Sequence, residues 1–211
     1  MNSYSQACQD LFVSKVLKNK RQGTFLEIGS NHPINTNNTY LLEKEYDWKG
    51  IMIEYDESFE PLYKEYRPNS IYIIDDARAV DYRGALDSNN FPENIDYLSL
   101  DLDVDNRSTL DTFLLLNSTV FDKYKFATIT LEHDIWSGDY FDTRNTTRDI
   151  LKKRGYVLVY PDVTVYYGGC KPFEDWYVHP DLVDMRLINA IKSDTSLTVD
   201  EIRLKLESLT Y

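Results

Sequence analysis

Residues 24–31 of this 211-residue chain read Thr24-Phe-Leu-Glu-Ile-Gly-Ser-Asn31, and this stretch decides the fold. Its apolar and aromatic residues predict a short strand, and Gly29 predicts a tight turn where a ligand can approach the backbone closely. The lysine of a GxxxxGKS/T phosphate loop is missing, and Asn31 and Pro33 stand where later glycines of a GxGxxG motif would be. The turn suits a pyrophosphate poorly, and an ordinary strand-to-helix turn is the alternative to a ligand site.

Six further strand-like runs follow this stretch, and helical patterns lie between most of them. The predicted strands cover residues 24–29, 50–55, 70–75, 95–101, 124–133, 155–160 and 163–167, and the helices between them cover 39–46, 58–66, 107–116 and 143–154. This alternation predicts a mainly parallel sheet covered by helices. Only Tyr160-Pro-Asp-Val163 separates the last two strands, so we expect them to form an antiparallel hairpin. The predicted fold is α/β and Rossmann-like, with seven strands in the order 3-2-1-4-5-7-6.

The length of the chain indicates a single domain over residues 1–211. A helical segment within 1–20 opens it, and helices within 180–211 close it, the last beginning at the capping-box pattern Thr198-Val-Asp-Glu201. No apolar run reaches the roughly 20 residues of a membrane span, and the start lacks signal-peptide features, so we expect a cytoplasmic location. The net charge of -12 opposes binding to a phosphate backbone and argues against a nucleic-acid partner.

Acidic residues occur at the ends of three successive predicted strands. Because ligands of an open α/β sheet bind beyond the carboxyl ends of its strands, these residues are candidate ligand contacts. Glu27 suits a ligand with a cationic amino-acid part, such as the methionine moiety of S-adenosylmethionine. Glu54 stands where Rossmann-type proteins place a carboxylate against ribose hydroxyls, and Asp75 and Asp76 stand where an adenine edge would lie. Singly, each acid is also typical of a solvated strand end or a helix cap.

The fourth and fifth predicted strands end in Asp101-Leu-Asp103 and Glu132-His133-Asp134. These strands are neighbours in the predicted order, so their acidic side chains should cluster. Two compatible chemistries fit this cluster. In one, His133 is the general base that takes the proton of an acceptor hydroxyl, beside Asp101 and Asp103. In the other, Asp101, Asp103 and Glu132 bind Mg²⁺ or Mn²⁺, which lowers the pKa of that hydroxyl.

Together, several of these segments resemble the FkbM-type methyltransferases. The match covers about residues 4–180. The matching residues are Tyr4-Ser-Gln6-Ala-Cys-Gln-Asp10-Leu-Phe, Phe25-Leu-Glu-Ile-Gly-Ser30, Ile53-Glu54, Asp96-Tyr-Leu-Ser-Leu-Asp101, Glu132-His-Asp134 and Glu174-Asp-Trp-Tyr-Val-His-Pro180. The family's fourth strand commonly continues Asp-x-Glu-Gly, whereas Asp101-Leu-Asp103-Val lacks that glycine, so we expect this loop to have a different shape.

The resemblance implies a class I methyltransferase fold, S-adenosylmethionine as the methyl donor, and usually a hydroxyl acceptor on a sugar or a natural product. By this resemblance, Gln6 lies near the amino-acid end of the cofactor, and Glu27, Gly29, Glu54 and Asp76 contact it. With the neighbouring strand-end and turn residues, the predicted cofactor contacts are Gln6, Glu27, Gly29, Ser30, Asn31, Glu54, Asp75 and Asp76.

The acceptor is expected to bind short loops, because no substrate domain interrupts the chain. The aromatic segments 134–141, with Trp136, and 173–177, with Trp176, are candidate contacts, since carbohydrate rings stack on aromatic faces. Each tryptophan singly is equally typical of a core residue. A hydroxyl of a glycan or deoxysugar is the leading acceptor. Three other functions stay open: a non-catalytic nucleotide-binding module, a methyltransferase of a non-sugar small molecule, and an NAD-dependent oxidoreductase, which the missing glycines disfavour. A homo-oligomer also stays open.

Overall fold

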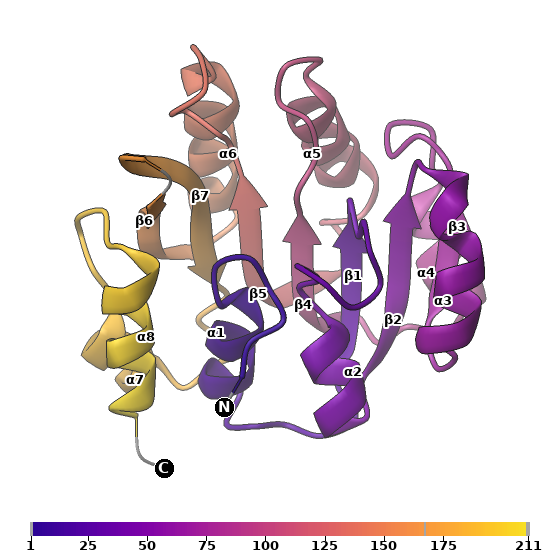
Figure 1. Cartoon of the computed structure of the whole chain (residues 1–211), viewed down its shortest axis with the longest axis horizontal. Helices are drawn as coiled ribbons and strands as arrows, with labels where there is room; N and C mark the ends of the chain where they lie inside the picture. Colours follow the sequence, from indigo (N-terminus) through magenta and orange to yellow (C-terminus); the bar gives the residue numbers. More distant parts are fainter. Residues whose placement is uncertain (1, 167, 210–211) are drawn as a thin grey trace.

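The structure, a computed structural model, describes residues 2–166 and 168–209 and contains one seven-stranded sheet (Figure 1). The strand order is β3-β2-β1-β4-β5-β7-β6, which confirms the predicted Rossmann-like order. The pairings from β3 to β5 are parallel, whereas β7 runs antiparallel to both β5 and β6. The strands are β1 (Thr24–Ile28), β2 (Lys49–Glu54), β3 (Ile71–Ile74), β4 (Asn94–Leu100), β5 (Lys125–Glu132), β6 (Val157–Tyr166) and β7 (Cys170–Val178).

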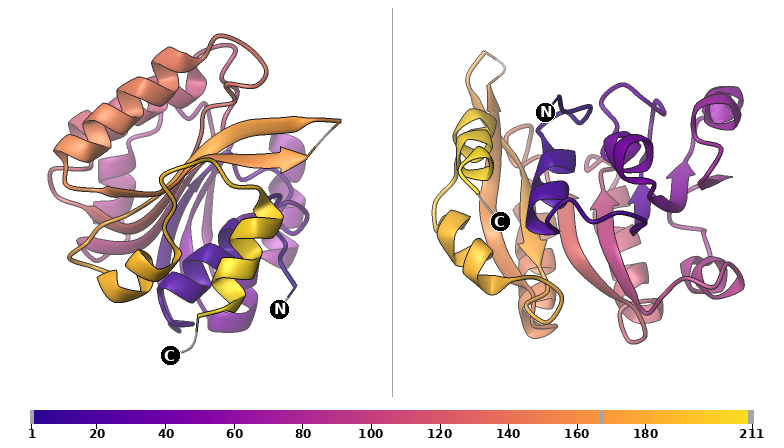
Figure 2. Two further views of the ribbon diagram at one scale, coloured as in Figure 1. Left: turned by 90° about the vertical axis from the view of Figure 1, so that its left-hand side faces the viewer. Right: turned by 90° about the horizontal axis from the view of Figure 1, so that it is seen from below.

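Helices cover both faces of this sheet, as Figures 1 and 2 show. One hydrophobic core joins α1, α2, α3, α7 and α8 to one face, and a second core joins α4, α5 and α6 to the other. The helices are α1 (Gln9–Val16), α2 (Tyr40–Tyr46), the short 3₁₀ helix η1 (Glu57–Phe59), α3 (Glu60–Tyr66), α4 (Tyr82–Ser88), α5 (Ser108–Thr119), α6 (Phe141–Lys153), α7 (Met185–Ile191) and α8 (Val199–Glu207).

The central strand β1 explains why residues 24–31 decide the fold. All five of its residues are buried, because β2 and β4 flank it and helices cover both of its faces. Its side chains alternate between the two cores, with Phe25 in the first and Leu26 and Ile28 in the second. Glu27 points to the same side as Phe25 and is the only charged residue of the strand. The chain therefore leaves the sheet at its centre, directly after Ile28.

The predicted hairpin turn at residues 160–163 is wrong. Residues Val157–Tyr166 form the single strand β6, which pairs with β7 through register shifts in this segment. Asp162 has a φ of 50°, and its backbone N–H donates to the side-chain carboxylate of Asp175 in β7 at 2.8 Å instead of to a backbone carbonyl of that strand. The segment is therefore a bulge that kinks one strand, and not a turn that ends it.

The true connection of the hairpin lies between β6 and β7, where Gly168 and Gly169 have positive φ values. The sequence pattern does not predict β7, because the buried charged residues Glu174 and Asp175 interrupt its apolar run. The predicted last strand ended at Tyr167, which lies outside the described residues, as do residues 1, 210 and 211 of the predicted terminal segments.

Two smaller features of the helices bear on the predictions. The short helix α4 was not predicted, whereas the capping box at Thr198 and Glu201, which begins α8, is confirmed. Within residues 2–166 and 168–209, none of the helices combines the length and the apolar character that crossing a membrane requires.

Candidate functional site

A cavity of about 380 Å³, which we call the central cavity, lies at the carboxyl ends of β1 to β5. These are the upper ends of the parallel arrows in Figure 1, where an open α/β sheet places its ligands. The predicted site residues that line the cavity are Gln6, Gly29, Asn31, Glu54, Asp75, Asp101, Asp103 and Glu132. The other lining residues are Thr36, Ile53, Tyr55, Ala77, Leu102 and Asp134.

Gly29 makes the tight turn that the sequence predicts at the end of β1. Its φ is 82°, and a Cβ atom at this position would lie 1.8 Å from the carbonyl oxygen of Asp101. Its backbone N–H and that of Ser30 both donate to the carbonyl oxygen of Ile53 at 3.0 Å. The turn is thus pressed between the ends of β2 and β4, with no room for a side chain.

Glu54 holds the next part of this turn from the end of β2. Its Oε2 accepts a hydrogen bond of 2.7 Å from the backbone N–H of Asn31, whose φ is 48°. Its Oε1 accepts from the backbone N–H groups of Tyr55 and Asp56 at 2.9 Å. Of about four lone-pair sites on the carboxylate, these three hydrogen bonds leave about one for a ligand, and the neighbouring Tyr55 side chain is 78% exposed. This arrangement suits a ligand that carries hydroxyl groups and a flat ring.

Glu27 lies behind the cavity and outside its lining. The backbone N–H of Asn38 and the hydroxyl of Thr39 donate to its carboxylate at 3.0 and 2.7 Å, and the Asn37 amide donates at 3.3 Å. Burial raises the pKa of Glu27 to about 7. Its carboxylate thus fastens the loop that connects β1 to α2, and its predicted contact with the cofactor stays a prediction.

Two other predicted cofactor residues also lie outside the lining of the central cavity. The Ser30 hydroxyl is buried and lies 2.8 Å from the Tyr63 hydroxyl, beneath the turn. Asp76 is half-buried and pairs with the Arg78 guanidinium at 2.7 Å, and hydrogen bonds from Arg78 lower the pKa of Asp76 to about 2. Its neighbour Asp75 lines the cavity instead.

Acidic side chains from the ends of β4 and β5 meet on one wall of the central cavity. Burial raises the pKa of Asp101, and the charges of Asp134 and Asp103 raise it further. Burial also raises the pKa of Glu132 well above its usual range, followed by the charge of Asp101. Asp101 and Glu132 interact directly, and two buried neighbouring carboxyl groups favour one shared proton over two negative charges. This acidic pair can therefore take up and release a proton.

His133 points away from this wall. Side chains alternate along a strand, so the imidazole faces the side opposite to Glu132 at the end of β5. Glu132 and Asp134 line the cavity. The imidazole is fully buried, with its Nε2 3.4 Å from Asp175 and 3.5 Å from Asp162. The structure thus separates His133 from the acidic residues that surround it in the sequence, and its role as the base stays a prediction.

Arg148 completes the surroundings of His133. It donates to the Asp175 carboxylate at 2.6 Å and to Asp162 at 2.8 Å, and Arg144 donates to Asp162 at 3.1 Å. Burial alone would raise the pKa of Asp175, but the hydrogen bonds from Arg148 and the nearby His133 imidazole hold it well below its usual range. We call His133, Arg148, Asp162 and Asp175 the histidine cluster.

The histidine cluster also bears on the metal prediction. Among residues 2–166 and 168–209, the acidic and ligating side chains that converge within 4.8 Å are His133, Asp162 and Asp175. Two guanidinium groups already neutralise these carboxylates, so a cation would meet positive charge there. The predicted ligands Asp101, Asp103 and Glu132 do not converge in this way within the described part of the chain. The donor set therefore does not form a divalent-cation site as it stands.

A second hollow, of about 350 Å³, adjoins the central cavity and shares Gln6, Glu132 and Asp134 with it. We call it the side hollow. Its other lining residues are Trp136, Val165, Lys171 and Phe173. Trp136 and Phe173 belong to the two aromatic segments that the sequence predicts as acceptor contacts. Val165 and Lys171 were not predicted, because they come from the hairpin whose strands were predicted wrongly.

Trp136 forms a fixed aromatic wall of the side hollow. Its Nε1–H donates to the Asp134 carboxylate at 2.9 Å, and the Lys171 ammonium lies 3.7 Å from its ring centroid. The indole remains 43% exposed. Trp176, the other predicted acceptor contact, is instead buried against Phe12 and Tyr160, so it belongs to the core.

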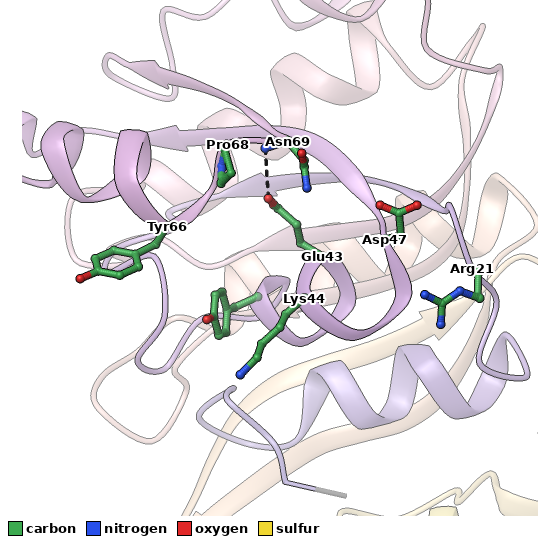
Figure 3. Close-up of a pocket in the computed structure, with 8 residues that line it drawn as sticks. Arg21, Glu43, Lys44, Asp47, Tyr66, Pro68 and Asn69 are labelled. Carbon is green, nitrogen blue, oxygen red and sulfur yellow. Dashed lines mark hydrogen bonds between the residues drawn. The ribbon is translucent and has the colours of Figure 1, made fainter.

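A separate hollow lies beside α2 at the opposite end of the sheet, and Figure 3 shows its residues. Arg21, Asp47 and Asn69 precede β1, β2 and β3, so this hollow lies at the amino ends of the parallel strands. Its charged groups are already partnered: Glu43 pairs with the buried Arg67 at 2.8 Å, and Lys44 bonds to the Tyr4 hydroxyl at 2.9 Å. We therefore assign no ligand to it.

Comparison with known proteins bears on the fold. No protein-family model matches the chain, and no curated protein matches it. Solved structures do match, and three of them illustrate the likeness. A TehB-like SAM-dependent methyltransferase from Corynebacterium glutamicum has a TM-score of 0.52 at 9% identity, over 84% of this chain and 89% of that chain.

The other two structures extend the same likeness. An rRNA methylase from Streptococcus thermophilus has a TM-score of 0.52 at 13% identity, over 85% of this chain and 98% of that chain. Human methyltransferase-like protein 13, in complex with S-adenosylhomocysteine (SAH), has a TM-score of 0.52 at 12% identity, over 97% of this chain and 91% of that chain. The chain thus has the Rossmann-like fold of class I SAM-dependent methyltransferases, and membership of the FkbM family stays a prediction.

Proposed function

We propose that the protein is a SAM-dependent methyltransferase that transfers a methyl group to a hydroxyl group of a sugar. The observation that carries this proposal is the central cavity, which joins Gly29 and Glu54 at one side to the acidic pair Asp101 and Glu132 at the other. The fold supports it, and one structure of the same fold holds SAH, the product of methyl donation. The residues for binding a donor and for removing a proton therefore meet in one cavity.

The donor has a matching set of side chains in the central cavity. Glu54 suits the ribose hydroxyls, Asp75 the amino edge of adenine, and the exposed Tyr55 ring the face of the base. Gln6, at the border with the side hollow, suits the amino-acid end of the donor. When bound, S-adenosylmethionine supplies the methyl group as an activated sulfonium, so the protein has to orient the acceptor and remove one proton.

The acidic pair is our candidate for proton removal. A bond forms between the acceptor oxygen and the methyl carbon while the bond from sulfur to that carbon breaks, leaving SAH. The hydroxyl proton passes to the carboxylate of Glu132, which shares protons with Asp101. Because their pKa values are raised, these carboxylates are stronger bases than a solvated acid, and a base of this kind contributes roughly 10² to 10⁴ in rate.

The side hollow is our candidate for the acceptor. It opens on Glu132 and Asp134 and offers the indole of Trp136 as an apolar face. Carbohydrate rings combine apolar faces with hydroxyl groups, so a stacked ring with its hydroxyl toward Glu132 fits this combination. The net charge of -12 and the absence of lysine and arginine from the lining of the central cavity disfavour a nucleic-acid acceptor.

We further propose that the reaction is independent of metal, since the carboxylates predicted to bind Mg²⁺ or Mn²⁺ do not converge on one point within the described residues. Methylation should continue in EDTA at an unchanged rate. Loss of turnover in EDTA that Mg²⁺ or Mn²⁺ restores would return the metal to the mechanism.

Calorimetry tests the donor site before any acceptor is known. We expect SAH to bind and NAD to show no binding. Binding of NAD alone would overturn the proposal in favour of an oxidoreductase. Screening sugars and non-sugar hydroxyl compounds with labelled S-adenosylmethionine then tests the acceptor class. Binding of SAH without turnover on any hydroxyl compound would favour a non-catalytic nucleotide-binding module.

A further inference from the structure

A third hollow, of about 510 Å³, continues from the side hollow across the outer part of β6. We call it the outer hollow. Its lining includes Gln6 and Val165, which also line the side hollow. Gln6 borders the central cavity as well. The three hollows therefore form one track that runs from the predicted donor residues, past Gln6, to the start of α8.

The outer hollow has fixed walls. The backbone N–H of Thr164 donates to the carbonyl oxygen of Leu197 at 2.9 Å, and Thr164 forms a parallel bridge with Thr198. The Thr164 hydroxyl lies 2.8 Å from that of Ser196, and the capping box with Glu201 holds Thr198 in place. The strand β6 and the start of α8 are thus joined side by side, so the hollow belongs to the fold and not to a loose loop.

The segment that carries Gln6 is also held in position, although the Gln6 side chain is exposed. The Asp10 carboxylate, which is buried, accepts hydrogen bonds from the Ser3 hydroxyl at 2.6 Å and from the backbone N–H of Tyr4 at 2.7 Å. These bonds fold the segment before α1 back on itself and place Gln6 where the three hollows meet. Its amide can both donate and accept, so it suits a linkage between two polyhydroxylated units.

The lining of the outer hollow indicates what binds there. Tyr166 is 78% exposed, and Val165 and Val199 add apolar surface beside it. Asp200 is exposed and makes no ion pair within the described part of the chain, so its carboxylate is free to accept hydrogen bonds from hydroxyl groups. An aromatic ring and a free carboxylate on one wall are a combination that suits a carbohydrate.

The charge of the track favours a neutral chain over an acidic one. Neither the central cavity nor the outer hollow is lined by lysine or arginine, and the cation of the side hollow, Lys171, lies over the Trp136 ring. Glu132, Asp134 and Asp200 border the same track. A uronic acid or phosphate group would therefore meet mostly like charge.

We propose that the acceptor is a neutral oligosaccharide of at least two units, with the reacting unit in the side hollow and the next unit in the outer hollow against Tyr166. This inference rests on the proposed function and makes the acceptor longer than a single sugar. The chain would pass Gln6 and Val165, the two residues that the hollows share.

The test measures the affinity of the full chain, saturated with SAH, for an array of neutral oligosaccharides of one to six units. Polyuronates of equal length serve as the acidic ligands for comparison. We expect affinity to rise about fivefold to tenfold from one unit to two, which is the scale of one aromatic stacking contact, and the polyuronates to bind more weakly. For neutral sugars that are methylated, kcat/KM should rise with length in the same way.

Tyr166→Ala should bring the ratio of two-unit to one-unit affinity close to one. Leu204→Ala is the matched control, because Leu204 is 68% exposed on α8 and lines none of these hollows. Equal affinity for one and two units, a preference for polyuronates, or no binding to any neutral sugar would each overturn the inference. Calorimetry with SAH, run in parallel, reports separately on the proposed function.

Discussion

The backbone N–H of Asn31 donates a hydrogen bond of 2.7 Å to the Glu54 carboxylate, and this contact ties the turn after β1 to the end of β2. Both residues line the central cavity. The turn and the proposed ribose contact are therefore one unit, in which a change at Glu54 affects the shape of the turn as well as the charge of the site.

Glu54→Gln should weaken SAH binding by about tenfold or more, because the neutral amide accepts weaker hydrogen bonds than a carboxylate does. Calorimetry measures the change. Glu57→Gln is the matched control: Glu57 is exposed, lies three residues further along the chain and is not part of the cavity lining. Equal loss of affinity in both variants would show that Glu54 acts only through net charge.

Gly29→Ala should destabilise the fold by roughly 3 kcal/mol or more, since it combines an unfavourable positive φ with overpacking against backbone. A Cβ at position 29 would lie 1.8 Å from the Asp101 carbonyl oxygen. Gly155→Ala is the control, because Gly155 has a similar φ of 86° and open space around it. Denaturant unfolding should give Gly155→Ala a loss of only about 1 to 2 kcal/mol, the cost of a side chain at positive φ. Similar losses in the two variants would mean that the close approach to Asp101 is unimportant.

The sequence was sufficient to predict the five parallel strands and their ligand-binding edge, because strand-end positions follow from the apolar runs and the turn at Gly29. Gly29, Glu54 and Asp101 were predicted on this basis and line one cavity. The position of His133 could not be read from its acidic neighbours, since alternation along the chain turns its ring to the opposite side. Applying the period of two to Glu132 and His133 at the end of β5 would have placed the imidazole on the side opposite to Glu132.

The acceptor side was harder to predict, because it depends on contacts between distant segments. Val165 lies in β6 and Lys171 in β7, and the register between these two strands depends on the bulge at Asp162. The backbone N–H of Asp162 is satisfied by the Asp175 side chain, and no local pattern in the sequence indicates such a bond. The partners of Glu27 were likewise hidden, since they lie in the loop before α2.

Glu27 should make the protein less stable as pH rises. Its pKa is about 7 in the folded protein, against 4.5 as its usual value, so the folded state binds more protons between these two values. Stability from this group is therefore fully present below about pH 4.5 and is lost as pH rises through about 7, by roughly 3 kcal/mol. Denaturant unfolding measures the free energy of unfolding of the protein and of Glu27→Gln across this pH range. We expect this free energy to fall less with rising pH in the variant, because the variant has no carboxyl group at position 27. Parallel profiles would contradict it.

Glu132→Gln should lower kcat by about 10² to 10⁴ while SAH still binds, because the variant lacks the proposed proton acceptor. In the unchanged protein, kcat should rise with pH as the Asp101 and Glu132 pair loses its shared proton, at a pH above the usual range of a carboxyl group.

His133→Gln should lower the melting temperature, since it disturbs the buried histidine cluster, yet keep this pH profile in the folded fraction. Asp139→Asn, an exposed change in the loop after Asp134, serves as the control. If His133→Gln abolished turnover in a folded protein while Glu132→Gln retained it, His133 would be the base and the acidic pair would not.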